Sequence, residues 1–129
     1  MVELIFKDEF FKIKAACIEV RKELGNGFLE KVYENSLATE FRFKGFKVES
    51  QKKLTVHYKG DVVGEYLADL VIDDKIIIEL KTCAMLTKIH KAQLMNYLKA
   101  TGYKLGILIN FPPDQVGFEI ERIPNFIEN

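Results

Sequence analysis

The chain lacks several features that would place it in a specialised class of protein. None of its apolar runs approaches the roughly 20 residues needed to cross a bilayer, so we expect no membrane-spanning helix. Its two cysteines, Cys17 and Cys83, stand apart without metal-ligand spacing and are interpreted as reduced thiols. The first eight residues carry acids early and have no signal-peptide organisation, which favours the cytoplasm.

Net charge, repeats and linkers are missing as well. The 19 basic and 19 acidic residues cancel, so bulk charge gives no sign of nucleic-acid binding. No acid occurs from Leu80 to Pro113, and the lysines of that stretch either form a solvated face or supply positive potential for a polyanionic substrate. Without a linker or a change in composition, 129 residues predict one domain, residues 1–129, with a real core.

Hydrophobic periodicity predicts three helices and six short strands. The expected helices cover residues 4–24, a segment that ends at Lys44, and residues 88–101; the expected strands cover residues 46–49, 53–58, 63–72, 75–81, 104–110 and 117–123. The order α-α-β-β-β-β-α-β-β favours an α/β fold with a central mixed sheet flanked by helices. The third helix suits a right-handed crossover between parallel strands.

Three charged residues lie on strands that have the composition of a core. Alternation places Glu79 and Lys81 on one face of strand 75–81, and Asp69 lies in phase with Val71 on the preceding strand. Buried charges cost several kcal/mol per ion unless they are paired or bound to metal. Two interpretations therefore stay open: Mg²⁺ or Mn²⁺ held by the two carboxylates and a backbone carbonyl, with Lys81 beside it, or an ion-pair network at a sheet end.

Polar residues on two helices are further candidates. Glu30 lies in the first turn of the second helix, where the helix dipole alone explains an acid. His90, Gln93 and Tyr97 follow one another at i, i+3 and i+7, so they share a face of the third helix. They either decorate the surface or line a cleft next to the charged strands.

Together these residues resemble the PD-(D/E)xK nuclease superfamily. More narrowly, they resemble the GxxExxY protein family, whose motif is matched by Gly27, Glu30 and Tyr33. The resemblance runs from about Ile13 to Phe111. It includes the segments Ala68-Asp69-Leu70, Glu79-Leu80-Lys81, His90–Leu98 and Gly106–Phe111.

The resemblance implies a restriction-endonuclease-like fold and residues for each catalytic role. Its metal-binding acids map to Asp69 and Glu79, with the Leu80 carbonyl as a further ligand and Glu30 as an additional helical acid. Its catalytic lysine maps to Lys81. The residues expected to contact substrate are Gln93 and Tyr97, which match the Gln-xxx-Tyr motif of RecB-like members, and His90.

We therefore expect a nuclease that uses Mg²⁺ or Mn²⁺ to hydrolyse phosphodiester bonds, with DNA favoured over RNA as substrate. A homodimer suits so small a core. One alternative is an inactive module of the same fold that binds nucleic acid or another partner. Another is a structural domain whose charges only pair. Metal binding separates the nuclease from both.

Overall fold

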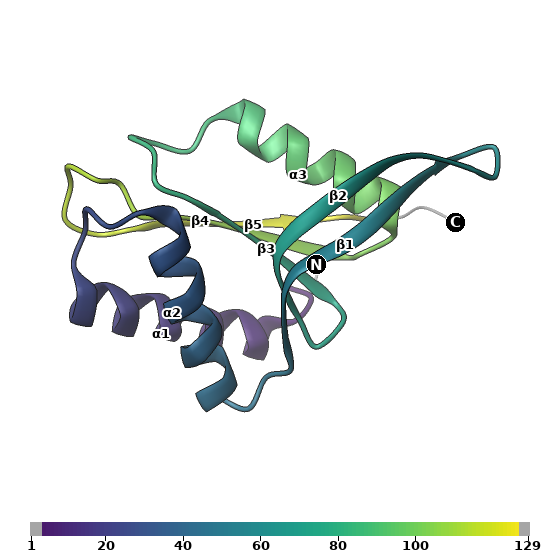
Figure 1. Ribbon diagram of the computed structural model, residues 1–129. Coiled ribbons are helices and arrows are strands. Elements are labelled where there is room, and N and C mark those ends of the chain that lie inside the picture. The colour runs from purple at the N-terminus through teal and green to yellow at the C-terminus, as the bar shows by residue number, and fades with distance from the viewer. Residues whose placement is uncertain (1–3, 127–129) are drawn as a thin grey trace.

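A five-stranded mixed sheet forms the centre of the protein in the computed structural model, which describes residues 4–126 (Figure 1). The elements are α1 (Lys7–Leu24), α2 (Glu30–Phe43), β1 (Val48–Tyr58), β2 (Asp61–Ile72), β3 (Ile76–Lys81), α3 (Lys88–Thr101), β4 (Leu105–Asn110) and β5 (Glu119–Pro124). The strand order is β1-β2-β3-β4-β5. Only β3 and β4 are parallel, and α3 connects them, which confirms the predicted crossover. Within the described residues, no helix has the length and apolarity that crossing a bilayer requires.

The predicted element order contained one strand too many. The segments expected at residues 46–49 and 53–58 belong to a single strand, β1. The polar run Ser50–Lys53 interrupts the apolar pattern between them, but Ser50 and Lys52 remain paired with β2. Helix α1 also starts later than expected, because Phe6 takes a left-handed φ of 53° just before it.

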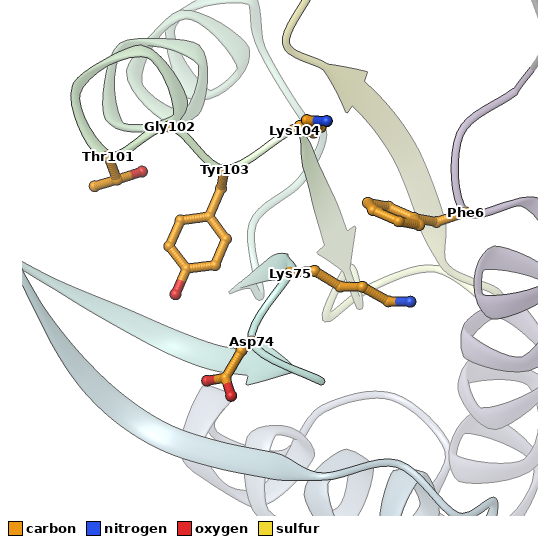
Figure 2. A pocket seen from close by; sticks show the side chains of 7 residues that line it. All are labelled: Phe6, Asp74, Lys75, Thr101, Gly102, Tyr103 and Lys104. Atoms are coloured by element: carbon orange, nitrogen blue, oxygen red, sulfur yellow. The ribbon is translucent and has the colours of Figure 1, made fainter.

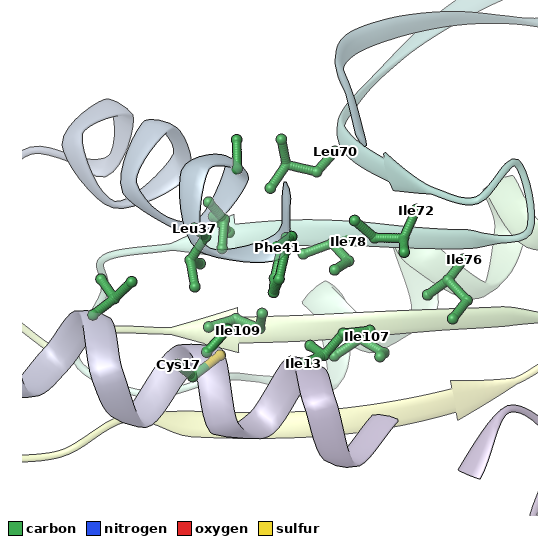
Figure 3. Packing of buried hydrophobic residues seen from close by; sticks show 14 of the residues in the cluster. Ile13, Cys17, Leu37, Phe41, Leu70, Ile72, Ile76, Ile78, Ile107 and Ile109 are labelled. Atoms are coloured by element: carbon green, nitrogen blue, oxygen red, sulfur yellow. The ribbon is translucent and has the colours of Figure 1, made fainter. Parts of the chain in front are cut away.

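Apolar side chains pack on both faces of the sheet. Helices α1 and α2 cover one face, where Phe41 lies among isoleucines of β3 and β4 (Figure 3). Helix α3 covers the other face with Leu94 and Leu98. The alternation predicted for β3 is confirmed, since Ile76 and Ile78 face α1 and α2 whereas Ile77 faces α3. Each such buried side chain contributes about 1.5–3 kcal/mol.

The hairpin of β1 and β2 breaks this alternation halfway along its length. On β2, Leu70 and Ile72 pack toward α1 and α2, but Tyr66 and Ala68, which share their alternation phase, pack toward α3. On β1, Val48 likewise packs toward α1 and α2, whereas Leu54, in the same alternation phase, packs toward α3. The outer half of the hairpin is therefore turned over toward the α3 side, and Figure 1 shows it curving out past the end of the sheet.

The two turns of the meander have the left-handed conformations that tight hairpins need. Asp73 and Asp74 have φ of 51° and 56°, and Lys59 and Gly60 have φ of 50° and 88°. Two consecutive residues with positive φ match the twist of antiparallel strands. Both turns were predicted from the sequence, and they fix the register that brings the ends of β2 and β3 together.

Candidate active site

The carboxylates of Asp69 and Glu79 lie where β2 and β3 separate. Backbone pairing between these strands ends at Leu70 and Ile78. Beyond that point Asp69 Oδ2 accepts a hydrogen bond of 2.8 Å from the Leu80 amide, and the Asp69 amide lies 3.4 Å from Glu79 Oε1. Each carboxylate thus contacts a backbone amide of the opposite strand. The arrangement gathers two acids at the carboxyl end of β3, the edge of an α/β sheet where ligands commonly bind.

The electrostatic surroundings of Glu79 favour a carboxyl that is either protonated or bound to a cation. Burial, together with the charge of Asp69, raises the pKa of Glu79 to about 8. The Tyr66 hydroxyl donates a hydrogen bond to Glu79 Oε1, and burial next to that carboxylate raises the pKa of Tyr66. Among residues 4–126, no lysine or arginine lies within ion-pairing distance of either acid. The two carboxylates therefore repel each other, and within the described part of the chain only hydrogen bonds from neutral groups offset that repulsion.

A cavity of about 200 Å³ gathers most of the predicted site residues. Glu79 and Lys81 line it from β3, and Tyr66 lines it from β2. The predicted helical residues His90, Gln93 and Tyr97 complete it from α3. The rings of Tyr66 and Tyr97 stack with centroids 3.8 Å apart, so the turned-over half of the hairpin is packed onto α3 beside the acids.

The connection that follows β3 is held by a buried amide. Asn110 Nδ2 donates to the Cys83 carbonyl and to Glu119 Oε1, at 2.9 and 2.8 Å, and Asn110 Oδ1 accepts from the Cys83 amide at 2.9 Å. Asn110 itself is fully buried. These bonds fix the chain between Lys81 and α3, and hence the position of the α3 residues that line the cavity.

In the motif of Gly27, Glu30 and Tyr33, the glycine and the tyrosine have structural roles, whereas the Glu30 side chain is available to bind a ligand. Gly27 has φ of 108°, a value that favours glycine. The Tyr33 hydroxyl donates to the Gly25 carbonyl at 2.7 Å, and its ring stacks on Phe111. Glu30 is the first residue of α2 and is exposed. Partial burial and the charge of Asp69 raise the pKa of Glu30, while Lys81 opposes this shift, so its carboxyl senses both residues.

His90 has a structural contact besides lining the cavity. Its Nδ1 accepts a hydrogen bond from the Thr87 amide at 3.1 Å, and the Thr87 hydroxyl accepts one from the His90 amide at 3.4 Å. This capping box closes the first turn of α3. A substitution of His90 would therefore disturb the helix as well as the cavity.

Three residues at the site were not predicted from the sequence: Tyr66, Glu34 and Gln51. Tyr66 was not singled out, because the turn-over of the hairpin that brings it beside α3 is not visible in the sequence pattern. Glu34 is only 2% exposed and forms an ion pair with Lys31. Its position one helical turn after Glu30 was the signal that could have found it. Gln51 Nε2 lies 2.8 Å from Glu34 Oε1 and 3.4 Å from Asp69 Oδ1.

No ready-made metal cluster accompanies these acids. Among the described residues, no group of three or more histidine, cysteine, aspartate or glutamate side chains is arranged to hold a metal ion. A larger hollow of about 450 Å³ lies at the opposite, amino-terminal ends of β3 and β4 (Figure 2). Its lining includes Asp74, Lys75 and Lys104 and none of the predicted site residues.

A family model for the PD-(D/E)XK nuclease superfamily matches residues 7–123. The chain belongs to this superfamily. The predicted superfamily and the predicted fold class are thereby confirmed, whereas the narrower GxxExxY assignment stays a prediction. A comparison with curated proteins gives no match.

Two solved structures share the fold. SSO0001 is 22% identical with a TM-score of 0.58, and the match covers 95% of this chain and 61% of that one. An alkaline exonuclease from Laribacter hongkongensis, LHK-Exo, is 12% identical with a TM-score of 0.53, over 98% of this chain and 73% of that one. This PD-(D/E)XK domain thus spans about three fifths of the length of SSO0001, and at these identities the likeness concerns the fold alone.

Proposed function

We propose that this PD-(D/E)XK protein is a metal-dependent nuclease that hydrolyses phosphodiester bonds in nucleic acid, with DNA as the favoured substrate. The observation that carries the proposal is the convergence of Asp69 and Glu79 without an ammonium partner, beside a cavity lined by Lys81. A domain whose charges only pair would place a lysine or arginine against these acids.

The donor set fits a hard divalent cation. Carboxylate and carbonyl oxygens are the ligands of Mg²⁺ and Mn²⁺. Burial and, after it, the charge of Asp69 raise the pKa of Glu79, and a bound cation would offset both by stabilising the anionic carboxylate. We assign Asp69, Glu79 and the Leu80 carbonyl as the ligands, and Glu30 as an additional acid. When bound there, the ion would polarise the phosphate and stabilise the leaving oxygen.

The chain's own residues supply the remaining roles. Lys81 would orient the attacking water and stabilise developing negative charge. Gln93, Tyr97 and His90 would hold the scissile strand, since all three line the cavity next to Lys81 and Glu79. We also propose the GxxExxY assignment on the motif residues, and a cytoplasmic setting on the two free cysteines.

A cleavage panel tests the proposal. Single- and double-stranded DNA and RNA are incubated with the protein and Mg²⁺ or Mn²⁺, beside Lys81→Ala and the control Lys99→Ala, an exposed lysine of α3 outside the cavity. We expect metal-dependent cleavage by the parent and by Lys99→Ala, and none by Lys81→Ala. Nucleic acid that is retained but left intact with either ion would identify the inactive binding module instead.

A further inference from the structure

Gln51 occupies a backbone conformation that β-strands normally avoid. Its φ is 52°, in the left-handed region, although both neighbours are paired with β2, Ser50 with Leu70 and Lys52 with Ala68. Residues with a side chain rarely adopt such angles, least of all within a strand. Gln51 therefore stands at the level of Asp69, where the hairpin turns over toward α3. Strain of this kind persists only where the surrounding structure enforces it, and it gathers at functional sites.

The side chain of Gln51 connects two carboxylates. Its Nε2 lies 2.8 Å from Glu34 Oε1 and 3.4 Å from Asp69 Oδ1. The Glu34 carboxylate is held in place, because its residue is 2% exposed and its other oxygen forms an ion pair with Lys31. The other oxygen of Asp69 accepts from the Leu80 amide. Asp69 is thus oriented through both of its oxygens.

An amide suits this position better than a charged group. A lysine between the two acids would neutralise Asp69 and compete with a cation for it. The two N–H groups of a glutamine amide satisfy carboxylate oxygens without cancelling their charge, and each oxygen keeps a further lone pair for a ligand. The contacts of Gln51 therefore orient Asp69 without placing a positive charge beside it.

We propose that Gln51 is a positioning residue for the metal site: it bridges Glu34 to Asp69 and holds the Asp69 carboxylate ready for the cation. The proposal rests on the metal-dependent nuclease function proposed above. The left-handed backbone directs the side chain toward α2, and the buried Glu34 gives it a fixed point. Groups that orient metal ligands from behind commonly change metal affinity or activity by about 10- to 100-fold when removed.

Two substitutions separate the side chain from the backbone. Gln51→Gly removes the amide and accepts a positive φ without cost. Gln51→Asn keeps an amide and tolerates a positive φ, but it is one methylene too short to span both acids. The control is Gln115→Asn, the same chemical change on the exposed loop before β5. Mn²⁺ affinity is measured by titration calorimetry, kcat and KM by cleavage of a DNA substrate, and Tm in the absence of metal.

We expect both Gln51 variants to bind Mn²⁺ about 10-fold or more weakly and to lose kcat to a similar degree. KM for DNA and the metal-free Tm should stay near the parent values, and the Gln115 control should match the parent throughout. If the parent binds Mn²⁺ and cleaves, and Gln51→Asn equals it in both, the role of Gln51 is refuted while the nuclease function stands. The positioning role of Gln51 is also refuted if both variants have a lowered Tm and the loss of Mn²⁺ affinity is explained by the smaller folded fraction. A parent that neither binds Mn²⁺ nor cleaves refutes the nuclease function, and the positioning role with it.

Discussion

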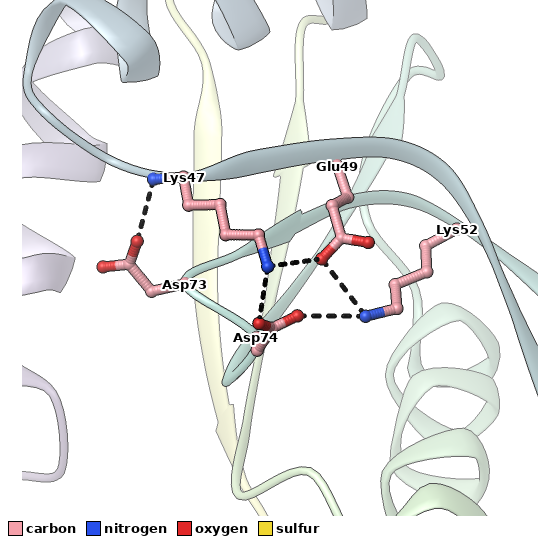
Figure 4. A network of polar contacts seen from close by, with 5 residues as sticks. All are labelled: Lys47, Glu49, Lys52, Asp73 and Asp74. Atoms are coloured by element: carbon pink, nitrogen blue, oxygen red, sulfur yellow. Dashed lines mark hydrogen bonds and ion pairs between the residues drawn. The ribbon is translucent and has the colours of Figure 1, made fainter.

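The two ends of the β2–β3 hairpin carry acids in opposite electrostatic states. At the turn, Asp74 lies between Lys47 and Lys52, at 2.8 and 3.0 Å, while Asp73 accepts from the Lys47 amide (Figure 4). These ammonium groups lower the pKa of Asp74. At the open end, burial and a neighbouring carboxylate raise the pKa of Glu79. The same kind of group, a carboxylate, is thus stabilised as an anion at one end and disfavoured as an anion at the other.

This difference separates acids that support the fold from acids that are available for chemistry. The lysines at the turn, Lys47 and Lys52, come from β1 and the residue before it, and they form ion pairs with the acid that they face. At the open end, burial and the neighbouring Asp69 disfavour the anionic form of Glu79, and no ammonium group pairs with either acid among residues 4–126. Titratable groups perturbed in this way, next to a cavity, are typical of functional sites.

The largest expected effect is loss of cleavage in Asp69→Asn. Asparagine can still accept from the Leu80 amide through its carbonyl oxygen and loses only the 3.4 Å contact with Gln51, so we expect the local fold to be retained. The negative charge of the metal ligand is lost. We expect activity to fall by about 100- to 1,000-fold or more, as it does when mutation removes a group that stabilises charge in a preorganised active site. Mn²⁺ should no longer raise Tm, whereas we expect it to raise the Tm of the parent by mass action. Cleavage assays and calorimetry with and without Mn²⁺ measure both.

The matched variant is Asp74→Asn at the turn. It should cleave at the parent rate and respond to Mn²⁺ as the parent does, while its Tm falls slightly because exposed ion pairs contribute little. If Asp69→Asn instead lowered the metal-free Tm, and the parent ignored Mn²⁺, the acids at both ends would be structural. The distinction between the two clusters would then be wrong.

A pH series should show opposite slopes for the two clusters. Glu79 has a pKa raised from 4.5 to about 8, so its contribution to stability is fully present below about pH 4.5 and is lost as pH rises toward about 8. Asp74, whose pKa is lowered from 3.8, contributes above that value and loses its contribution as pH falls further. In metal-free protein we expect Tm to fall by about 5 °C or more between pH 5 and 8 relative to Glu79→Gln, since 1 kcal/mol shifts Tm by roughly 2–8 °C.

Saturating Mn²⁺ should remove most of that fall, because the cation stabilises the anionic form of Glu79. Differential scanning calorimetry at several pH values, with Mn²⁺ or with a chelator, measures the slopes. If Tm changed with pH in parallel for the parent and Glu79→Gln, the surroundings of Glu79 would not disfavour its anionic form.

The sequence predicted the parts of this site that depend on local patterns. Helix α3 was predicted with its observed bounds, because its periodicity, its Gly102 end and its connection length agree. Asp69, Glu79 and Lys81 stood out because charge is costly in strands of core composition. The faces of β3 followed from simple alternation and were confirmed.

The residues that the sequence did not predict depend on one non-local feature. Strict alternation along β2 would place Tyr66 on the same face as Leu70 and Ile72, but the hairpin turns over at the left-handed Gln51 of β1. Glutamine carries no signal for such a conformation, unlike glycine or asparagine. Glu34 resembled an ordinary helical acid, since burial of one carboxylate depends on packing against β1 rather than on its own helix.

A smaller effect is expected from Tyr66→Phe, which leaves the charges of both clusters unchanged. The variant keeps the ring that stacks on Tyr97 and loses only the hydrogen bond to Glu79. That bond favours the anionic carboxylate, so its loss should raise the pKa of Glu79 further. We expect about 10- to 100-fold lower activity at neutral pH, the worth of a hydrogen bond to a charged group. The pH–rate profile should shift to higher pH. An unshifted profile would mean that Tyr66 acts only through packing.

The smallest effect is expected from Gln93→Ala, which asks whether the cavity next to the unpaired acids receives substrate. Gln93 lines that cavity and is exposed, and the side-chain hydrogen bonds of residues 4–126 include none from its amide. Its removal should therefore change stability by no more than about 0.5 kcal/mol. Cleavage should fall about 2- to 10-fold, the worth of one neutral hydrogen bond to the nucleic acid. His90 cannot provide this test, because its ring nitrogen caps α3.

Asn96→Ala is the matched control for Gln93, since Asn96 is exposed on the same helix and lies outside the cavity. Steady-state cleavage and thermal melts are compared for both variants. A lower rate for Gln93→Ala at unchanged Tm, with Asn96→Ala like the parent, would extend the functional cluster from the acids to α3. A lowered Tm with an unchanged rate per folded molecule would assign Gln93 to packing, and the functional end of the hairpin would then stop at Lys81.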